Sequence, residues 1–203
     1  MSNESEIKEP ITSTSIDESV QVQQNSRELE LSERVAELEK QLERALMLIS
    51  DIYLYGKLRD LLAAGKWKQA DQETARVMLE ISGKTDKENL IPDDVIKFPC
   101  SVIHLIDQLW IKYSNGLFGF SVQKKVYEST GGTFDISQIN MKVLHKTAEE
   151  LGLRLNGRDI PYEELNFSLE APRGSFPVAW WNSPYGAKLI VYFLARLNAC
   201  NID

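Results

Sequence analysis

The chain has 203 residues, 43% of them hydrophobic, which is enough for one domain of ordinary size with an appendage. Its net charge of −7 argues against a nucleic-acid-binding protein, because phosphate contacts need a concentrated surface of lysine and arginine. The longest apolar run, residues 189–195, is far shorter than the ~20 residues of a membrane span, and we expect no secretory signal.

The N-terminal part of the chain divides into two stretches. Residues 1–28 are rich in serine, glutamate and glutamine, a composition that predicts a disordered tail. Over residues 29–54, apolar side chains recur at alternating steps of four and three, which predicts a coiled-coil helix. This heptad seam consists of Leu31, Val35, Leu38, Leu42, Ala45, Ile49 and Ile52.

The charges beside the heptad seam favour self-association. Arg34 and Glu39 occupy flanking positions at which they would pair between two parallel chains. We therefore expect a homo-oligomer through residues 29–54. The alternative interpretation is a single amphipathic helix that packs on its own domain.

The remainder of the chain predicts an all-α fold. Helical spacing of apolar residues predicts helices over residues 58–64, 67–82, 99–113, 123–129, 136–151 and 184–197, with one further helical turn at 93–96. Residues 155–169 contain Asn156, Gly157 and Pro161 without sustained periodicity and are interpreted as a long loop.

The stretch from Tyr113 to Ser129 forms a corner between two of these helices. Asn115 and Gly116 tolerate positive φ and end the first helix, and Ser121 is a candidate cap for the second. Phe118 and Phe120 place two rings at this corner. The corner is therefore either ordinary core or the floor of an apolar pocket.

The sequence offers little for catalysis or metal binding. Cys100 and Cys200 do not form a CxxC pair, so we expect reduced thiols in a cytosolic protein rather than a disulfide. His104 and His145 lie on different helices, and His104 is interpreted as a hydrogen-bonded core or edge histidine. No set of acid, base and nucleophile emerges, so we expect neither an enzyme nor a metal centre.

Three motifs resemble one protein family. The string FPCSVIHLIDQLWIKYSNGLFGFSVQKKVYES (98–129) is similar to the central signature of the genomes-uncoupled-four family, porphyrin-binding proteins that stimulate magnesium chelatase in chlorophyll biosynthesis. KWKQADQETARVMLEISG (66–83) resembles its first helix pair, and APRGSFP (171–177) its closing motif. The resemblance implies a compact cupped-hand helical domain over residues 55–178, in the cytoplasm of a photosynthetic organism. Residues 179–203 do not match the family's ligand-flanking segment, and the helix predicted there is interpreted as a C-terminal extension.

The resemblance also implies a ligand and a set of site residues. The ligand is protoporphyrin IX or Mg-protoporphyrin IX, bound non-covalently between an apolar wall and cations that pair with its carboxylates. The matching wall positions are Phe98, Phe118, Phe120 and Val122. The candidate cations, chosen because they lie in or near the motifs, are Lys124, Lys125, Arg154 and Arg173. The implied function is a tetrapyrrole-binding regulator that contacts the large subunit of magnesium chelatase.

The chain departs from the family pattern in ways that support a second hypothesis. The family's loop before the closing motif is rich in tryptophan, whereas the aromatic residues here are Tyr162 and Phe167. A family arginine falls at Ala75, and Arg76 one step further points ~100° away on a helix. The alternative is a coiled-coil oligomerised signalling or interaction module with vestigial or altered tetrapyrrole binding.

Overall fold

The computed structural model describes residues 14–85, 89–178, 180–181 and 183–203, with the side chains of the first helix described at 27–42 and from 54 onward. The chain divides into two compact units, Met1–Asp51 (unit 1) and Ile52–Asp203 (unit 2). Each unit is described by itself below. None of the helices in the described residues is both long enough and apolar enough to cross a membrane.

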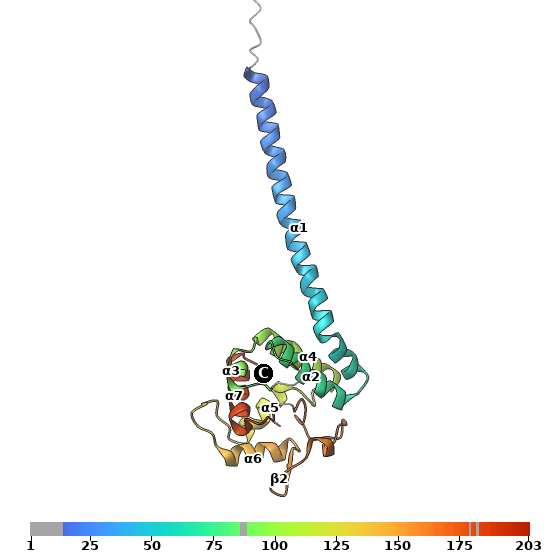
Figure 1. Cartoon of the computed structure of the whole chain (residues 1–203), viewed down its shortest axis with the longest axis vertical. Helices are drawn as coiled ribbons and strands as arrows, with labels where there is room; N and C mark the ends of the chain where they lie inside the picture. Colours follow the sequence, from blue (N-terminus) through green and yellow to red (C-terminus); the bar gives the residue numbers. More distant parts are fainter. Residues whose placement is uncertain (1–13, 86–88, 179, 182) are drawn as a thin grey trace, which may run out of the picture. The chain divides into compact units, whose positions relative to one another are not determined.

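The first helix, α1 (Thr14–Ala63), is longer than the sequence predicts (Figure 1). It is helical over residues 14–28, where a disordered tail is expected. The physical reason is composition, because no proline or glycine occurs between Thr14 and Tyr55 and glutamate, glutamine, leucine and arginine favour helices. Residues 1–13 of the expected tail lie outside the described residues.

Unit 2 is mostly helical, as expected. Its further helices in the described residues are α2 (Trp67–Ile81), α3 (Pro92–Lys97), α4 (Cys100–Tyr113), α5 (Phe120–Ser129), α6 (Met141–Glu150), the short 3-10 helix η1 (Tyr162–Glu164) and α7 (Gly186–Ala199). Helix α7 packs against α3 and α5, and α5 also packs against α4 and α6 (Figure 1). Helix α5 is therefore the element around which the C-terminal half of unit 2 is assembled.

A small β-hairpin lies within the stretch that the sequence analysis interprets as a loop. Strands β1 (Arg154–Leu155) and β2 (Arg158–Asp159) pair antiparallel. Asn156 and Gly157 connect them with φ angles of 50° and 76°, the left-handed conformation that a two-residue hairpin turn requires. The all-α prediction is thus correct for the layout but misses this hairpin.

The corner between α4 and α5 forms where the sequence predicts it. Asn115 and Gly116 have φ angles of 54° and 77°, and they end α4. Helix α5 begins at Phe120, and its N-terminus is capped by the Asp107 carboxylate, whose Oδ1 accepts a hydrogen bond from the Ser121 amide at 2.9 Å. Ser121 is therefore inside the helix and is not its cap, which corrects the sequence-based assignment.

Gly119 makes this cap possible. Its φ of 144° is strained for residues with a side chain, and a Cβ placed there would lie 2.7 Å from Oδ1 of Asp107. Glycine thus allows the backbone of the corner to approach α4 closely enough for the carboxylate to reach α5.

The two cysteines form a disulfide, which corrects the expectation of reduced thiols. Cys100 at the start of α4 is bonded to Cys200 at the end of α7. The junction is reinforced by His104, whose Nε2 lies 2.9 Å from the Cys200 carbonyl, and by Arg196, which donates two hydrogen bonds to the Phe98 carbonyl. The cysteines are 100 residues apart in sequence, so their proximity depends on how α7 packs.

Candidate functional site

The four predicted wall residues lie in the interior of unit 2. Phe118 and Phe120 have no exposed surface, and Phe98 and Val122 are 2% exposed. Of the two interpretations of the corner, ordinary core describes this structure. The prediction that these four side chains contact a ligand stays a prediction, and it requires a rearrangement that uncovers them.

The two corner rings point into different aromatic clusters. The ring of Phe118 packs edge-on against three others, with centroids 5.2 to 6.3 Å away, those of Trp67, Trp110 and Phe176. The ring of Phe120 packs 4.7 Å from Trp180 and 5.2 Å from Phe193. Phe118 therefore joins α2 and α4 to the closing motif, whereas Phe120 joins α5 to α7.

The four predicted cations engage separate surroundings. The side chain of Lys124 is only 8% exposed, and its Nζ lies 3.1 Å from Asp203 Oδ1 and 3.7 Å from Glu128 Oε1. Arg154 pairs with Asp159 across the β-hairpin. Lys125 and Arg173 are exposed. Lys125 and Arg173 are thus the two predicted cations that face solvent without an ion pair among the described residues.

The closing motif is held onto the corner by a buried glutamine that the sequence analysis did not single out. Gln123 Nε2 donates hydrogen bonds of 2.8 Å to the carbonyls of both Gly174 and Pro177, and Oε1 accepts one of 3.5 Å from Trp181 Nε1. Gln123 has no exposed surface. The Gln123 side chain therefore connects α5 to the closing motif about 50 residues later, and its amide nitrogen and oxygen are both hydrogen-bonded.

A second buried group fastens the same segment to α2. Asp71 accepts hydrogen bonds from the Val178 amide at 2.6 Å and from the Tyr162 hydroxyl at 3.0 Å. Burial raises the pKa of the Asp71 carboxyl to about 6, although both hydrogen bonds act in the opposite direction. The loop between β2 and α7 is thus held at η1 and at residue 178 by one carboxylate.

Helix α2 also borders an open hollow of about 560 Å³, here named the α2 hollow. This volume lies within the range of small-molecule sites. Both Ala75 and Arg76 line it, so the arginine that the sequence places ~100° from the family position still reaches the same hollow. Its other lining residues, from α1 and α2, are Lys57, Leu61, Gln69, Gln72, Glu73 and Leu79.

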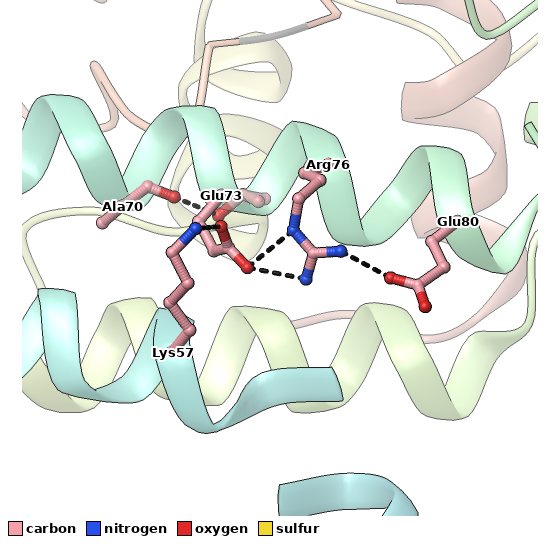
Figure 2. A network of polar contacts seen from close by, with 6 residues as sticks. Lys57, Ala70, Glu73, Arg76 and Glu80 are labelled. Carbon is pink, nitrogen blue, oxygen red and sulfur yellow. Dashed lines mark hydrogen bonds and ion pairs between the residues drawn. The ribbon is translucent and has the colours of Figure 1, made fainter. Parts of the chain in front are cut away.

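The cations of the α2 hollow belong to a polar network (Figure 2). Glu73 accepts from Lys57 Nζ at 2.6 Å and from Arg76 at 2.7 and 2.8 Å, and Arg76 also contacts Glu80 at 2.6 Å. Burial raises the pKa of Glu73, but hydrogen bonds from Arg76 and Lys57 outweigh burial and lower it below the usual value. Glu73 therefore stays ionised and fixes both cations at the rim.

This arrangement offers groups that can bind and orient a small molecule carrying a carboxylate. Leu61, Leu79 and Ala75 offer apolar contacts, while Gln69 and Gln72 supply amide donors. The guanidinium of Arg76 can exchange the partly exposed Glu80 for a ligand carboxylate without losing its bond to Glu73. Binding and orientation are the chemistry that these groups support.

Comparisons with known proteins agree with the motifs. The model of the GUN4-like family matches residues 50–191. The chain is 29% identical over 156 residues to the "Tetrapyrrole-binding protein, chloroplastic" of Arabidopsis thaliana, covering 70% of this chain and 54% of the relative. It is 34% identical over 82 residues to the "Ycf53-like protein" of Synechocystis, covering 39% and 35% respectively. The chain thus spans about half or less of these curated relatives.

Solved structures show the same fold. The ligand-free structure of Arabidopsis thaliana GUN4 superimposes with a TM-score of 0.58 at 27% identity, covering 70% of this chain and 94% of that chain. The structure of GUN4 from Chlamydomonas reinhardtii gives a TM-score of 0.54 at 25% identity, covering 68% and 86%. The similarity therefore extends over nearly the whole of both solved domains.

Proposed function

Because the chain belongs to the GUN4-like family, we propose that it is a non-catalytic tetrapyrrole-binding protein that regulates chlorophyll biosynthesis. The observation that carries the proposal is the family match over residues 50–191, which includes α2, the corner and the closing motif. The proposed ligand is protoporphyrin IX or Mg-protoporphyrin IX, and the proposed partner is the large subunit of magnesium chelatase.

We place the ligand's carboxylates at the α2 hollow. A tetrapyrrole needs apolar contacts for its faces and cations for its propionates, and the hollow supplies both kinds of group. Arg76 supports this placement because its guanidinium is held by Glu73 yet keeps a partly exposed edge. In this arrangement the buried rings of Phe118 and Phe120 support the domain from within, and the ligand contacts residues of α1 and α2.

The residues matched through the family motifs form the competing placement. Lys125 and Arg173 are exposed and are available to a carboxylate without breaking an existing ion pair among the described residues. A ligand bound there would lie near the corner and the closing motif rather than along α2. The two placements are distinguished by which variants weaken binding.

Titration with protoporphyrin IX tests the proposal itself. Bound porphyrin should quench the tryptophan fluorescence of the full chain, and its own absorbance should shift. Both signals should saturate at porphyrin concentrations at or below tens of micromolar. An absence of saturable binding in that range would overturn the proposed function. A dissociation constant in the micromolar range is the expected outcome for an open site of this size.

Variants then locate the ligand. Gln72→Glu adds a carboxylate to the α2 hollow, one helical turn before Arg76. It should weaken binding about tenfold, because it repels the propionates and competes with them for Arg76. Gln138→Glu makes the same chemical change on an exposed residue between α5 and α6 and should not change binding. Weakening by Arg173→Ala or Lys125→Ala, with no effect of Gln72→Glu, would favour the competing placement.

The regulatory half of the proposal needs a separate readout. Reconstituted magnesium chelatase should insert Mg²⁺ into protoporphyrin IX faster when the chain is present, and Gln72→Glu should reduce that stimulation in proportion to its loss of binding. Binding without stimulation would retain the tetrapyrrole proposal and remove the chelatase partner.

A further inference from the structure

The heptad seam leaves apolar side chains exposed in the part of unit 1 whose side chains are described. Leu31, Val35, Leu38 and Leu42 are between 51% and 64% exposed. They lie on one stripe of α1, since they are separated by steps of four and three residues. A continuous stripe of four large apolar side chains marks a surface that another molecule covers.

The spacing fits a second helix of the same kind. In heptad numbering Val35 and Leu42 occupy a positions, and Leu31 and Leu38 occupy d positions. A β-branched residue at a with leucine at d favours a parallel two-stranded coiled coil. Val35 with Leu31 and Leu38 has this pattern, whereas Leu42 at the next a position is not β-branched. The sequence continues this spacing to Ile52, which extends the seam over residues 29–54, a length of about 39 Å in a helix.

Charge complementarity selects the partner and its direction. Arg34 at g and Glu39 at the following e flank the seam, and in a parallel pair each Arg34 faces the Glu39 of the other helix. We propose that a second copy of this chain covers the heptad seam, forming a parallel dimer through α1. This inference goes beyond the proposed function and holds whether or not a tetrapyrrole binds.

The state of the pure protein in solution distinguishes this occupant from others. A different partner protein, or packing of the seam on its own unit 2, leaves the isolated chain a monomer of 23.1 kDa. A second copy doubles the mass and makes the dimer fraction depend on concentration. Equilibrium sedimentation of the full chain up to about 100 μM separates these outcomes.

A seam variant and a matched control assign the interface. Leu38→Lys places a charge at the centre of the seam and should convert the dimer to a monomer, with at least a tenfold weaker association. Leu29→Lys is the control, because Leu29 is equally apolar and 63% exposed but occupies a b position outside the seam. A wild-type monomer, or equal association of Leu38→Lys and wild type, would overturn the proposal.

Charge exchange tests the parallel orientation. Arg34→Glu alone and Glu39→Arg alone each place like charges across both g–e pairs and should weaken association several-fold at low salt. The double variant carrying both substitutions restores the pairs and should recover wild-type association. Failure of the double variant to recover would refute the parallel arrangement, and the melting temperature of unit 2 should be the same in all three variants.

Discussion

Helix α7 and the described part of α1 carry the same kind of apolar stripe with opposite exposure. Leu189, Phe193 and Leu197 on α7 are buried, because α3 and α5 of the same unit cover them (Figure 1). Leu31 and Leu38 on α1 are more than half exposed. Helical periodicity therefore predicts which face of a helix is apolar. Which element packs against that face depends on the tertiary structure.

The comparison separates a folding interface from an assembly interface. Burial of the α7 stripe contributes to the free energy of unfolding of unit 2, whereas the exposed heptad seam contributes to the free energy of association. Substitutions inside unit 2 should accordingly change its free energy of unfolding. The self-association constant of the folded protein should stay unchanged.

The largest effect is expected at the corner. Phe118→Ala removes a ring that contacts Trp67, Trp110 and Phe176, and it should lower the free energy of unfolding of unit 2 by about 4 kcal/mol. Urea unfolding followed by tryptophan fluorescence measures this loss. Phe118→Leu keeps most of the side-chain volume, so it should lower the free energy of unfolding much less. Equal decreases for the two variants would show that the ring does not stabilise unit 2 by filling space at the corner.

Reduction of the disulfide should have the next largest effect. The Cys100–Cys200 bond closes a loop of 100 residues, so its loss should lower the free energy of unfolding of unit 2 by about 3 kcal/mol. Thermal unfolding with and without a thiol reductant measures the difference. The double variant Cys100→Ser with Cys200→Ser should melt at the lower temperature and ignore the reductant; an unchanged melting temperature would show that the bond does not restrain the unfolded chain.

The pH dependence set by Asp71 should be smaller. Burial raises the pKa of the Asp71 carboxyl from 3.8 to about 6. At a pH between these two values, the carboxyl is protonated in the folded state and ionised in the unfolded state. This contribution to stability is complete below the unfolded pKa and disappears as the pH rises through 6. Between pH 4.5 and pH 8, wild type should therefore lose about 2 kcal/mol relative to Asp71→Asn.

Asparagine is the informative replacement because it stays neutral while its Oδ1 accepts from the Val178 amide. Urea unfolding of both proteins across this pH interval provides the test. Parallel curves for the two proteins would contradict the assignment of the proton to Asp71. The heptad seam should associate equally in both, which keeps the effect within unit 2.

Local signals in the sequence were sufficient for much of the fold. The positive φ angles of Asn115 and Gly116 follow from residue type, and the stripe of α7 follows from periodicity, so the corner and most helices were predicted to within a few residues. The Asn156–Gly157 pair is also a local signal, since it is typical of a two-residue hairpin turn. The β-hairpin was missed because this pair was interpreted only as part of a loop. The family motifs likewise depend on the order of residues along the chain.

The candidate site was less accessible because its contacts join distant residues. Sequence alone could not decide whether Phe118 and Phe120 line a pocket or fill a core, since that depends on the rings of α2, α7 and the closing motif that surround them. The functions of Gln123 and Asp71 were invisible for the same reason. Arg76 is an example: the sequence places it one residue from the position of the family arginine, at Ala75, but both residues line the α2 hollow.

By itself, the sequence determined the family, the helical layout and the heptad seam, because these depend on residue type and on spacing along one segment. The tertiary structure decided the disulfide, the burial of the corner rings and the ion pairs that hold the rim of the α2 hollow. The physical reason is that burial and pairing are properties of neighbours in space, and those neighbours are up to 107 residues apart in the chain.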